Sequence, residues 1–302
     1  MTAVLDIPVG RRTVHLNRPD KPLFPKDGIT KADLADYYRT VARRMLPQLR
    51  GRPLTMQRFP DGIEGPSFMH KDVPDYFPDW IRRAELPKAG GTVTYVLCED
   101  TATLVYLAGQ ACITPHRFLS RVDRPRHPDR LVFDLDPPGT DFAPVLRAAR
   151  WLRPLLDDLG LPSAVMTTGS RGLHVIVPLD RRADFDEVRT FARDVADVLA
   201  AGHPDALTTE PRKAARRGRL YLDVQRNAYG QTAVAPYAVR PLPGAPVAAP
   251  VDWTEIDEPG FDARRWTLHT VGERLDANPW GDVLSRGRSL TRARRALDAL
   301  AG

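Results

Sequence analysis

The amino-acid sequence predicts an α+β fold, and three features of residues 131–224 support this. Short apolar strand candidates recur, two amphipathic helix candidates separate them, and the order is strand, helix, hairpin of two strands, helix, strand. That order is the split βαβ pattern of a ferredoxin-like or RNA-recognition-like sheet. We therefore expect such a sheet in the middle of the chain.

Five segments have the apolar spacing of helices. The first begins after Thr30, a residue type that caps helix N-termini well. Helices are also expected over 141–159 and 186–201, each followed by glycine, and near 263–275 and 282–300. Pro154 should kink the helix that contains it.

The expected strands are short and bounded by turn residues. They cover 13–16, 54–58, 92–97, 131–136, 164–167, 173–178, 219–224 and 233–239. The proline-rich segment 241–250 is the expected exposed loop or lobe boundary. We expect one domain over 1–302, with an N-terminal α/β lobe over about 1–125, a core over about 126–245 and a C-terminal helical closure over about 246–302.

The composition is that of an ordinary soluble globular protein, with 42% hydrophobic and 27% charged residues among 302. No apolar run is long enough to span a bilayer, and the first residues lack the apolar core of a signal peptide, so we expect a cytoplasmic protein with no membrane partner. Cys98 and Cys112 lie in apolar stretches without CxxC spacing. Two buried thiols are therefore favoured over a disulfide or a zinc site.

The positive charge is clustered. Lys and Arg number 44 against 38 Asp and Glu, a net charge of +6, and arginines gather within 121–130, 212–219 and 286–295. One such cluster is more often a solvated face. Three together favour a polyanion such as nucleic acid, because neutralising phosphates releases counterions.

Two acids end a strongly apolar strand at 131–137 (LVFDLDP). Asp134 and Asp136 point to one face, and Pro137 then ends the strand, which would place the pair at the edge of the sheet. Neighbouring carboxylates repel unless a cation lies between them, and Mg²⁺ or Mn²⁺ prefers such ligands. Alone, this pattern is more often a pair of exposed strand-end acids. Asp223, on the polar face of a second strand, completes a set able to hold two metal ions.

The segment 167–174 (TTGSRGLH) joins two strands. Glycines and hydroxyl residues at a turn can aim backbone N–H groups at an anion, and Arg171 adds a guanidinium suited to phosphate. A plain hairpin would need no function, and the ending of a Walker A loop is missing. His116, Arg226 and Arg240 are further polar candidates because they lie near these motifs.

The sequence resembles the polymerase domains of bacterial ligase D, end-joining enzymes of the archaeo-eukaryotic primase superfamily. The resemblance rests on LVFDLDP, the turn GSRGLH at 169–174, YLDVQRN at 221–227 and APYAVR at 235–240, in that order, and it runs from about Val14 to Trp280. It implies a primase-type catalytic core with an RNA-recognition-like sheet, and a nucleotide and metals in the cleft between two lobes.

The resemblance also implies a role for each candidate residue. Asp134, Asp136 and Asp223 would hold two catalytic ions, Mn²⁺ or Mg²⁺, and Asp223 would help to activate the primer 3′-hydroxyl. The nucleotide-binding residues would be Thr168, Ser170, Arg171, His174 and Arg240 at the triphosphate, His116 near the sugar, and Arg226 at the nucleotide or template. Thr168 and Arg171 stand where the family usually has Ser and often has Lys.

The N-terminal part resembles the family segment that binds the 5′-phosphate across a gap. Lys21, in DKPLFP at 20–25, and Lys31 would supply the charge, and Phe68, in GPSFMHK at 65–71, would stack near the template base. The sequence departs from the family in having Met69 for a second stacking aromatic and Gln57 for a common basic residue. It also lacks the usual Trp after the histidine.

The implied function is template-directed nucleotidyl transfer in DNA repair, as gap filling and end extension that favour ribonucleotides. The implied partners are DNA with gaps or broken ends bearing a 5′-phosphate, NTPs and dNTPs, a separate ATP-dependent DNA ligase and a Ku-type end-binding protein, all at the nucleoid. Two alternatives are a primase that needs no primer and a non-catalytic end-binding scaffold. The complete acidic triad argues against the scaffold, because a pure binder gains nothing from three carboxylates facing a polyanion.

Overall fold

The structure, a computed structural model, describes residues 3–301, which form two compact units. The first unit contains 3–118, Thr232–Ala249 and Trp266–Ala277. The second contains Leu119–Gln231, Pro250–Arg265 and the residues from Asn278 onward. The chain therefore returns twice to the first unit after building most of the second.

The second unit is built on a six-stranded sheet in the order β13-β14-β10-β12-β11-β16. Its strands are β10 (Arg130–Asp136), β11 (Ala164–Thr167), β12 (Leu173–Pro178), β13 (Leu207–Thr208), β14 (Leu220–Asp223) and β16 (Pro250–Val251). Helix α3 (Ala143–Asp158) follows β10, and α4 (Phe185–Gly202) follows β12. The predicted order of strand, helix, hairpin, helix and strand is confirmed.

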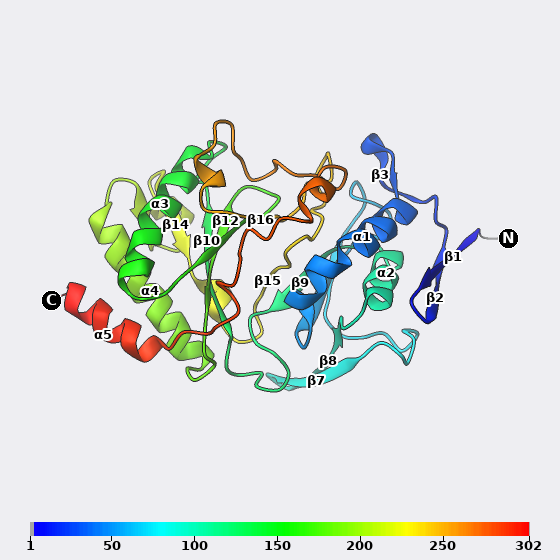
Figure 1. The fold of residues 1–302 in the computed structure, drawn as a ribbon, viewed down its shortest axis with the longest axis horizontal. Helices are drawn as coiled ribbons and strands as arrows, with labels where there is room; N and C mark the ends of the chain where they lie inside the picture. Colours follow the sequence, from blue (N-terminus) through cyan, green and yellow to red (C-terminus); the bar gives the residue numbers. More distant parts are fainter. Residues whose placement is uncertain (1–2, 302) are drawn as a thin grey trace. The chain divides into compact units, whose positions relative to one another are not determined.

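Helices α3 and α4 lie beside each other along this sheet (Figure 1), and both contact β10. A capping box begins α4, where Asp184 accepts from the Glu187 N–H and Glu187 accepts from the Asp184 N–H. Phe133 and Leu135 are buried and share one face of β10. The acids of β10 therefore point to the opposite face. Helix α5 (Leu290–Ala301) packs against α4.

The first unit has a sheet in the order β15-β9-β5-β8-β7, with β6 paired to β5. Its strands are β5 (Pro53–Arg58), β6 (Phe68–His70), β7 (Arg83–Lys88), β8 (Gly91–Leu97), β9 (Cys112–Phe118) and β15 (Thr232–Val234). Helices α1 (Lys31–Leu49) and α2 (Thr101–Gly109) pack against each other. Thr30 caps α1 in a capping box with Asp33, as its sequence predicts.

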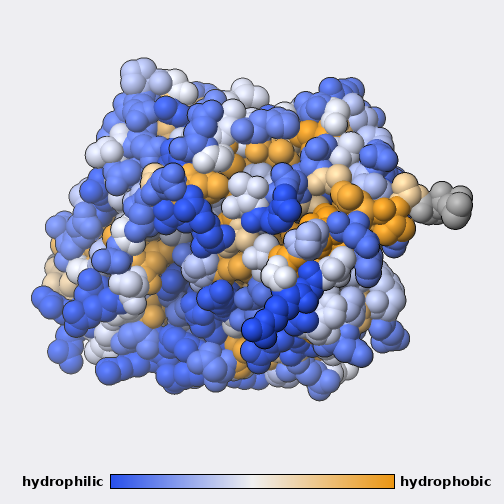
Figure 2. Space-filling model, turned by 45° about the vertical axis from the view of Figure 1, so that its right-hand side comes forward, coloured by the Kyte–Doolittle hydropathy of each residue, from blue (hydrophilic) through white to orange (hydrophobic). Residues whose placement is uncertain are grey.

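Two small hairpins complete the first unit. Strands β1 (Val4–Val9) and β2 (Arg12–Asn17) pair with each other, and so do β3 (Pro22–Phe24) and β4 (Ile29–Thr30). Val4 and Leu5 are exposed, and Figure 2 shows apolar surface gathered near the start of the chain. Both cysteines are free and buried, as expected.

Some expected elements are wrong. The segment 263–275 contains a 3-10 turn, η5 (Val271–Arg274), and no α-helix, because the hydroxyls of Thr267 and Thr270 bond nearby backbone N–H groups and compete with helical bonding. The last helix begins at Leu290 and not near 282. The segment 241–250 was expected to be an exposed loop or a lobe boundary. A boundary between the two units does fall at Ala249 and Pro250, but from 245 onward the segment is buried, because it pairs with neighbouring backbone. Across residues 3–301, no helix has the length and apolarity needed to cross a membrane.

Candidate active site

Three carboxylates meet on one face of the second unit's sheet. Asp134 of β10 lies opposite His174 of β12 on one side and opposite Asp223 of β14 on the other. Directly paired residues point to the same face of a sheet. The side chains of His174, Asp134 and Asp223 therefore form a row across β12, β10 and β14. Asp136 follows two residues later on the same face. The pair of acids was expected at the edge of the sheet, but β10 is an inner strand and the acids lie at its C-terminal end.

Asp134 is the buried member of the row, at 5% exposure. The His174 Nε2 lies 3.4 Å from its Oδ1, and the Arg226 Nε donates to its Oδ2 at 3.2 Å. Burial by itself would raise the pKa of Asp134, but the His174 ring and the Arg226 guanidinium outweigh burial and lower the pKa to about 2. Asp134 is therefore held as an anion between two basic groups.

The other two acids have the opposite tendency. Burial, and then the nearby Asp134 carboxylate, raise the pKa of Asp136 above its usual value, although the Arg171 guanidinium lies 3.6 Å away. Burial also raises the pKa of Asp223. The Gln225 N–H, which donates to its Oδ1 at 2.8 Å, lowers this pKa but does not outweigh burial. A cation between these groups would favour their ionised forms.

The carboxylate oxygens of Asp134, Asp136 and Asp223 are the kind of ligand that a hard divalent ion prefers. Three carboxylates on adjacent paired strands offer the oxygen ligands that Mg²⁺ and Mn²⁺ prefer. Within residues 3–301, no three His, Cys, Asp or Glu side chains already converge as a metal-binding group. Arg226 and Arg171 instead lie against Asp134 and Asp136, where an ion would supply the same positive charge.

The turn after β11 passes close to these acids. The Thr168 Oγ1 accepts from the N–H groups of Ser170 at 3.3 Å and Gly172 at 3.1 Å, and the Thr168 N–H donates to the Gly172 carbonyl. A Cβ on Gly172 would lie 2.1 Å from the Leu135 carbonyl oxygen and 2.6 Å from the Asp136 Oδ1. Glycine is therefore required for the turn to lie against β10.

Two sequence candidates, His116 and Arg240, lie in the first unit. His116 is on β9, paired with Thr55 and Val234. Arg240 ends the segment 235–240, which α1 holds in place. The Tyr37 hydroxyl donates to the Tyr237 carbonyl at 2.8 Å, and Tyr237 has a positive φ of 66°, a strained conformation for a non-glycine residue.

Lys21 and Lys31 are also in the first unit, joined by a bond from the Lys31 N–H to the Lys21 carbonyl. Lys21 pairs with Asp61 at 2.7 Å, whereas the Lys31 Nζ donates to the Asn17 carbonyl at 3.0 Å. Lys31 is buried at 7% exposure. Burial, followed by the charges of Arg18, Lys21 and Arg58, lowers its pKa to about 8.

Arg58 was missed by sequence reasoning and links this cluster to Phe68. Its guanidinium lies 5.6 Å from the centre of the Phe68 ring, and it contacts His70 and the Tyr76 hydroxyl, each at 3.0 Å. Phe68 itself is 45% exposed. The signal that could have found Arg58 is its position at the end of β5, directly opposite Phe68 in the β5–β6 pair.

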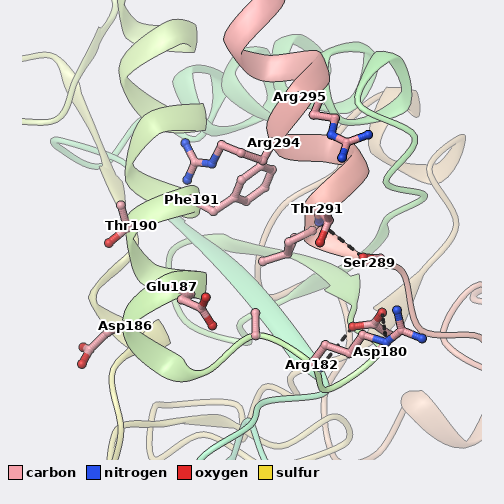
Figure 3. A pocket seen from close by; sticks show the side chains of 12 residues that line it. Asp180, Arg182, Asp186, Glu187, Thr190, Phe191, Ser289, Thr291, Arg294 and Arg295 are labelled. Atoms are coloured by element: carbon pink, nitrogen blue, oxygen red, sulfur yellow. Dashed lines mark hydrogen bonds and ion pairs between the residues drawn. The ribbon is translucent and has the colours of Figure 1, made fainter.

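A separate hollow of about 730 Å³ lies between α4 and α5 (Figure 3). Arg294 projects from α5 over the Phe191 ring and pairs with Asp194, and Arg182 pairs with Asp180. None of the three candidate metal-binding acids lines this hollow. This hollow is therefore distinct from the face that carries the β10 carboxylates.

The chain is similar to known proteins over most of its length. A family model for the LigD primase-polymerase domain matches residues 30–284. The multifunctional non-homologous end joining DNA repair protein LigD of Mycobacterium tuberculosis is 36% identical over 302 aligned residues, 95% of this chain and 39% of the relative. The bifunctional non-homologous end joining protein LigD of Bacillus subtilis is 33% identical, over 85% of this chain and 41% of the relative. The chain thus spans about two fifths of the length of these curated relatives.

A solved structure of the polymerase domain of Mycobacterium tuberculosis ligase D in complex with DNA has the same fold. It superimposes with a TM-score of 0.84 at 34% identity, covering 92% of this chain and 99% of that domain. The expected α+β, primase-type fold is thereby confirmed. Because the family model spans most of the chain and the solved domain matches it nearly end to end, the chain belongs to the family of LigD primase-polymerase domains.

Proposed function

We propose that the chain is a template-directed nucleotidyltransferase of DNA repair that fills short gaps and extends broken ends. The observation that supports this most is the row of Asp223, Asp134 and His174 with Asp136 beside it, next to a turn that carries Arg171. In the reaction, the primer 3′-oxygen attacks the α-phosphorus, and pyrophosphate leaves. The chain must therefore hold negative charge on the nucleotide and accept a proton from the primer.

Asp134, Asp136 and Asp223 are the residues that would hold two ions, Mn²⁺ or Mg²⁺. Bound there, the ions would favour the attacking alkoxide and offset charge on the leaving pyrophosphate. Asp223 would accept the 3′-hydroxyl proton as the base of this site. Arg226 and Arg171, which now neutralise Asp134 and Asp136, would then be available to the nucleotide.

The remaining candidates would position the substrates. In the second unit, Thr168, Ser170, Arg171 and His174 would surround the triphosphate, with Arg226 at the nucleotide or template. In the first unit, Arg240 would reach the triphosphate and His116 the sugar. Lys21 and Lys31 would bind a 5′-phosphate, since two lysines converging on a dianion form charge-assisted bonds. Phe68 would stack on a template base, because its ring is exposed and Arg58 lies against it.

The wider setting follows from the relatives, which are named as non-homologous end joining proteins. We propose that the substrates are NTPs in preference to dNTPs, on DNA gaps or ends bearing a 5′-phosphate. A separate ATP-dependent ligase and a Ku-type end-binding protein would be the partners, at the nucleoid in the cytoplasm.

The test removes one carboxylate. Asp136→Ala should abolish templated addition and leave DNA binding nearly intact, because the Asp136 side chain is half-exposed and its loss leaves the backbone pairing of the sheet unchanged. Asp186→Ala, an exposed acid at the start of α4, is the matched control and should keep full activity. Primer extension by an Asp136→Ala protein would show that the metal assignment is wrong. DNA binding by a wild-type protein without any addition would favour the scaffold, and addition on a template without primer would favour the primase.

A further inference from the structure

The turn at 168–172 is held from outside as well as from within. The Arg264 Nε donates to the Ser170 carbonyl at 2.7 Å, from a part of the chain 94 residues away. Thr168 fixes the inner side of the turn through the Ser170 and Gly172 N–H groups. Thr168 and Arg264 therefore hold the same turn through different backbone groups.

Arg264 is itself held in place by its neighbours. Phe261 and Ala263 are buried at 5% and 4% exposure, and the Asp262 Oδ1 accepts from the Arg264 N–H at 2.6 Å. Arg265 pairs with Glu258 at 2.6 Å. The backbone at Arg264 is thus fixed by burial and local bonding, and its side chain is directed toward the turn.

Arg264 and Arg171 border one hollow of about 590 Å³. Ser170 and Phe142 also line it, and Asp262 is the one acid in its lining, already bonded to the backbone of Arg264. Arg171 reaches from this hollow toward the Asp136 carboxylate at 3.6 Å. Two guanidinium groups beside a shared hollow repel each other unless an anion lies between them, and a planar guanidinium suits phosphate oxygens.

We propose that this hollow takes the terminal phosphate of the incoming nucleoside triphosphate, and that Arg264 binds this phosphate while holding the turn. The proposal rests on the proposed polymerase function and adds a residue from the segment after β16 to the nucleotide site. The Arg264 Nε donates to the Ser170 carbonyl and Arg264 lines the hollow, so its two terminal nitrogens are the donors that would bind a phosphate there. Arg171 stands beside Asp136 and lies between the hollow and the acids. The charge of a phosphate in the hollow would draw Arg171 away from Asp136.

The test compares Arg264→Ala and Arg264→Lys with the wild type at saturating gapped DNA. Arg264→Ala should raise the KM for an NTP by about tenfold or more, the usual effect of losing a charge-assisted bond. Inorganic tripolyphosphate, titrated by calorimetry with and without Mn²⁺, should bind more weakly by a similar factor. Arg264→Lys should recover part of the binding but not all, because one ammonium cannot hold both the Ser170 carbonyl and a phosphate.

Arg150→Ala is the matched control. Arg150 also ties down this part of the chain, since its Nε donates to Asp257 at 2.7 Å, but it does not line the hollow. It should leave the KM and tripolyphosphate binding unchanged. An equal KM for the NTP and equal tripolyphosphate binding in wild type and Arg264→Ala would overturn the proposal. A loss of DNA affinity with an unchanged KM would also overturn it, because that result would assign the hollow to a DNA phosphate. A wild type that binds tripolyphosphate through Arg264 but adds no nucleotide would instead contradict the polymerase function alone.

Discussion

The proposed 5′-phosphate site should become less selective as the pH rises through about 8, because Lys31 carries a pKa of about 8. Burial and the charges of Arg18, Lys21 and Arg58 disfavour its ammonium form. A lysine whose pKa is lowered in this way is charged below that pKa and neutral above it. A 5′-phosphate remains a dianion throughout this range, since its second pKa is about 6.

The magnitude follows from the titration of one group. With a pKa of about 8, the charged fraction of Lys31 falls from about nine tenths at pH 7 to about one tenth at pH 9. Above the pKa, binding a phosphate must first restore the proton, so the affinity falls by at most about tenfold per pH unit. We therefore expect the preference for phosphorylated over unphosphorylated gaps to fall by up to about tenfold between pH 7 and pH 9.

The assay is the ratio of the two dissociation constants, measured by fluorescence anisotropy on gapped duplexes that differ in the 5′-phosphate alone. Lys31→Arg should flatten the pH dependence, because arginine stays charged. Lys31→Met should lower the ratio at every pH. Lys26→Met is the matched control, since Lys26 lies in the same segment with an 82% exposed side chain. A wild-type ratio that stays constant from pH 7 to pH 9, or a Lys31→Arg profile like that of wild type, would refute the role of Lys31.

Three further predictions concern the frame and the template. Asn227→Ala should lower the free energy of unfolding by about 2–4 kcal/mol in urea titrations. The buried Asn227 side chain accepts from the Val132 N–H and donates to the Val132 and Val224 carbonyls, and the substitution removes all three bonds. A loss below about 0.5 kcal/mol would contradict this. Gly172→Ala should lower the free energy of unfolding by more than about 2 kcal/mol, because its Cβ would overlap the Leu135 carbonyl. The control Gly202→Ala, which has open space around its Cβ, should leave that free energy unchanged. Phe68→Ala should weaken binding of a template with an unpaired base by about 1–3 kcal/mol, and unchanged affinity in a gel-shift titration would exclude stacking.

The sequence predicts the sheet and its acids well, because both depend on local alternation. Asp134 and Asp136 are two residues apart on one strand, so their common face follows from strand geometry alone. Asp223 joins them through the pairing of β14 with β10. That pairing could be expected from the split βαβ order before any coordinates. Thr30 is likewise a local signal, since its capping partner Asp33 is three residues away.

Long-range contacts cannot be predicted from the sequence pattern, because they produce no periodicity in it. Arg264 meets Ser170 across 94 residues, and Arg58 reaches the Gln110 carbonyl across 52. The expected helix over 263–275 is wrong for a related reason. Its apolar residues are spaced as in a helix, but Trp266, Val271 and Leu275 are buried from a segment of turns and one 3-10 turn. Periodicity alone does not distinguish these two uses of apolar residues.

The sequence also does not show which of the proposed site residues lie close together in the fold. His116 and Arg240 were grouped with the acids because of the family resemblance, and the structure places them in the first unit while the acids lie in the second. Their roles at the nucleotide remain predictions, as do those of Lys21 and Phe68. Each can be measured separately, since each is expected to contact a different part of the substrate.

The central claim is tested most directly by primer extension on a short gapped duplex with a recessed 5′-phosphate, comparing NTPs with dNTPs in Mn²⁺ and in Mg²⁺. The account predicts templated addition that is faster with NTPs, depends on the 5′-phosphate and disappears in Asp136→Ala. Absence of addition under all of these conditions, by a protein that still binds the gap, would contradict it and leave the acids of β10 without a catalytic role.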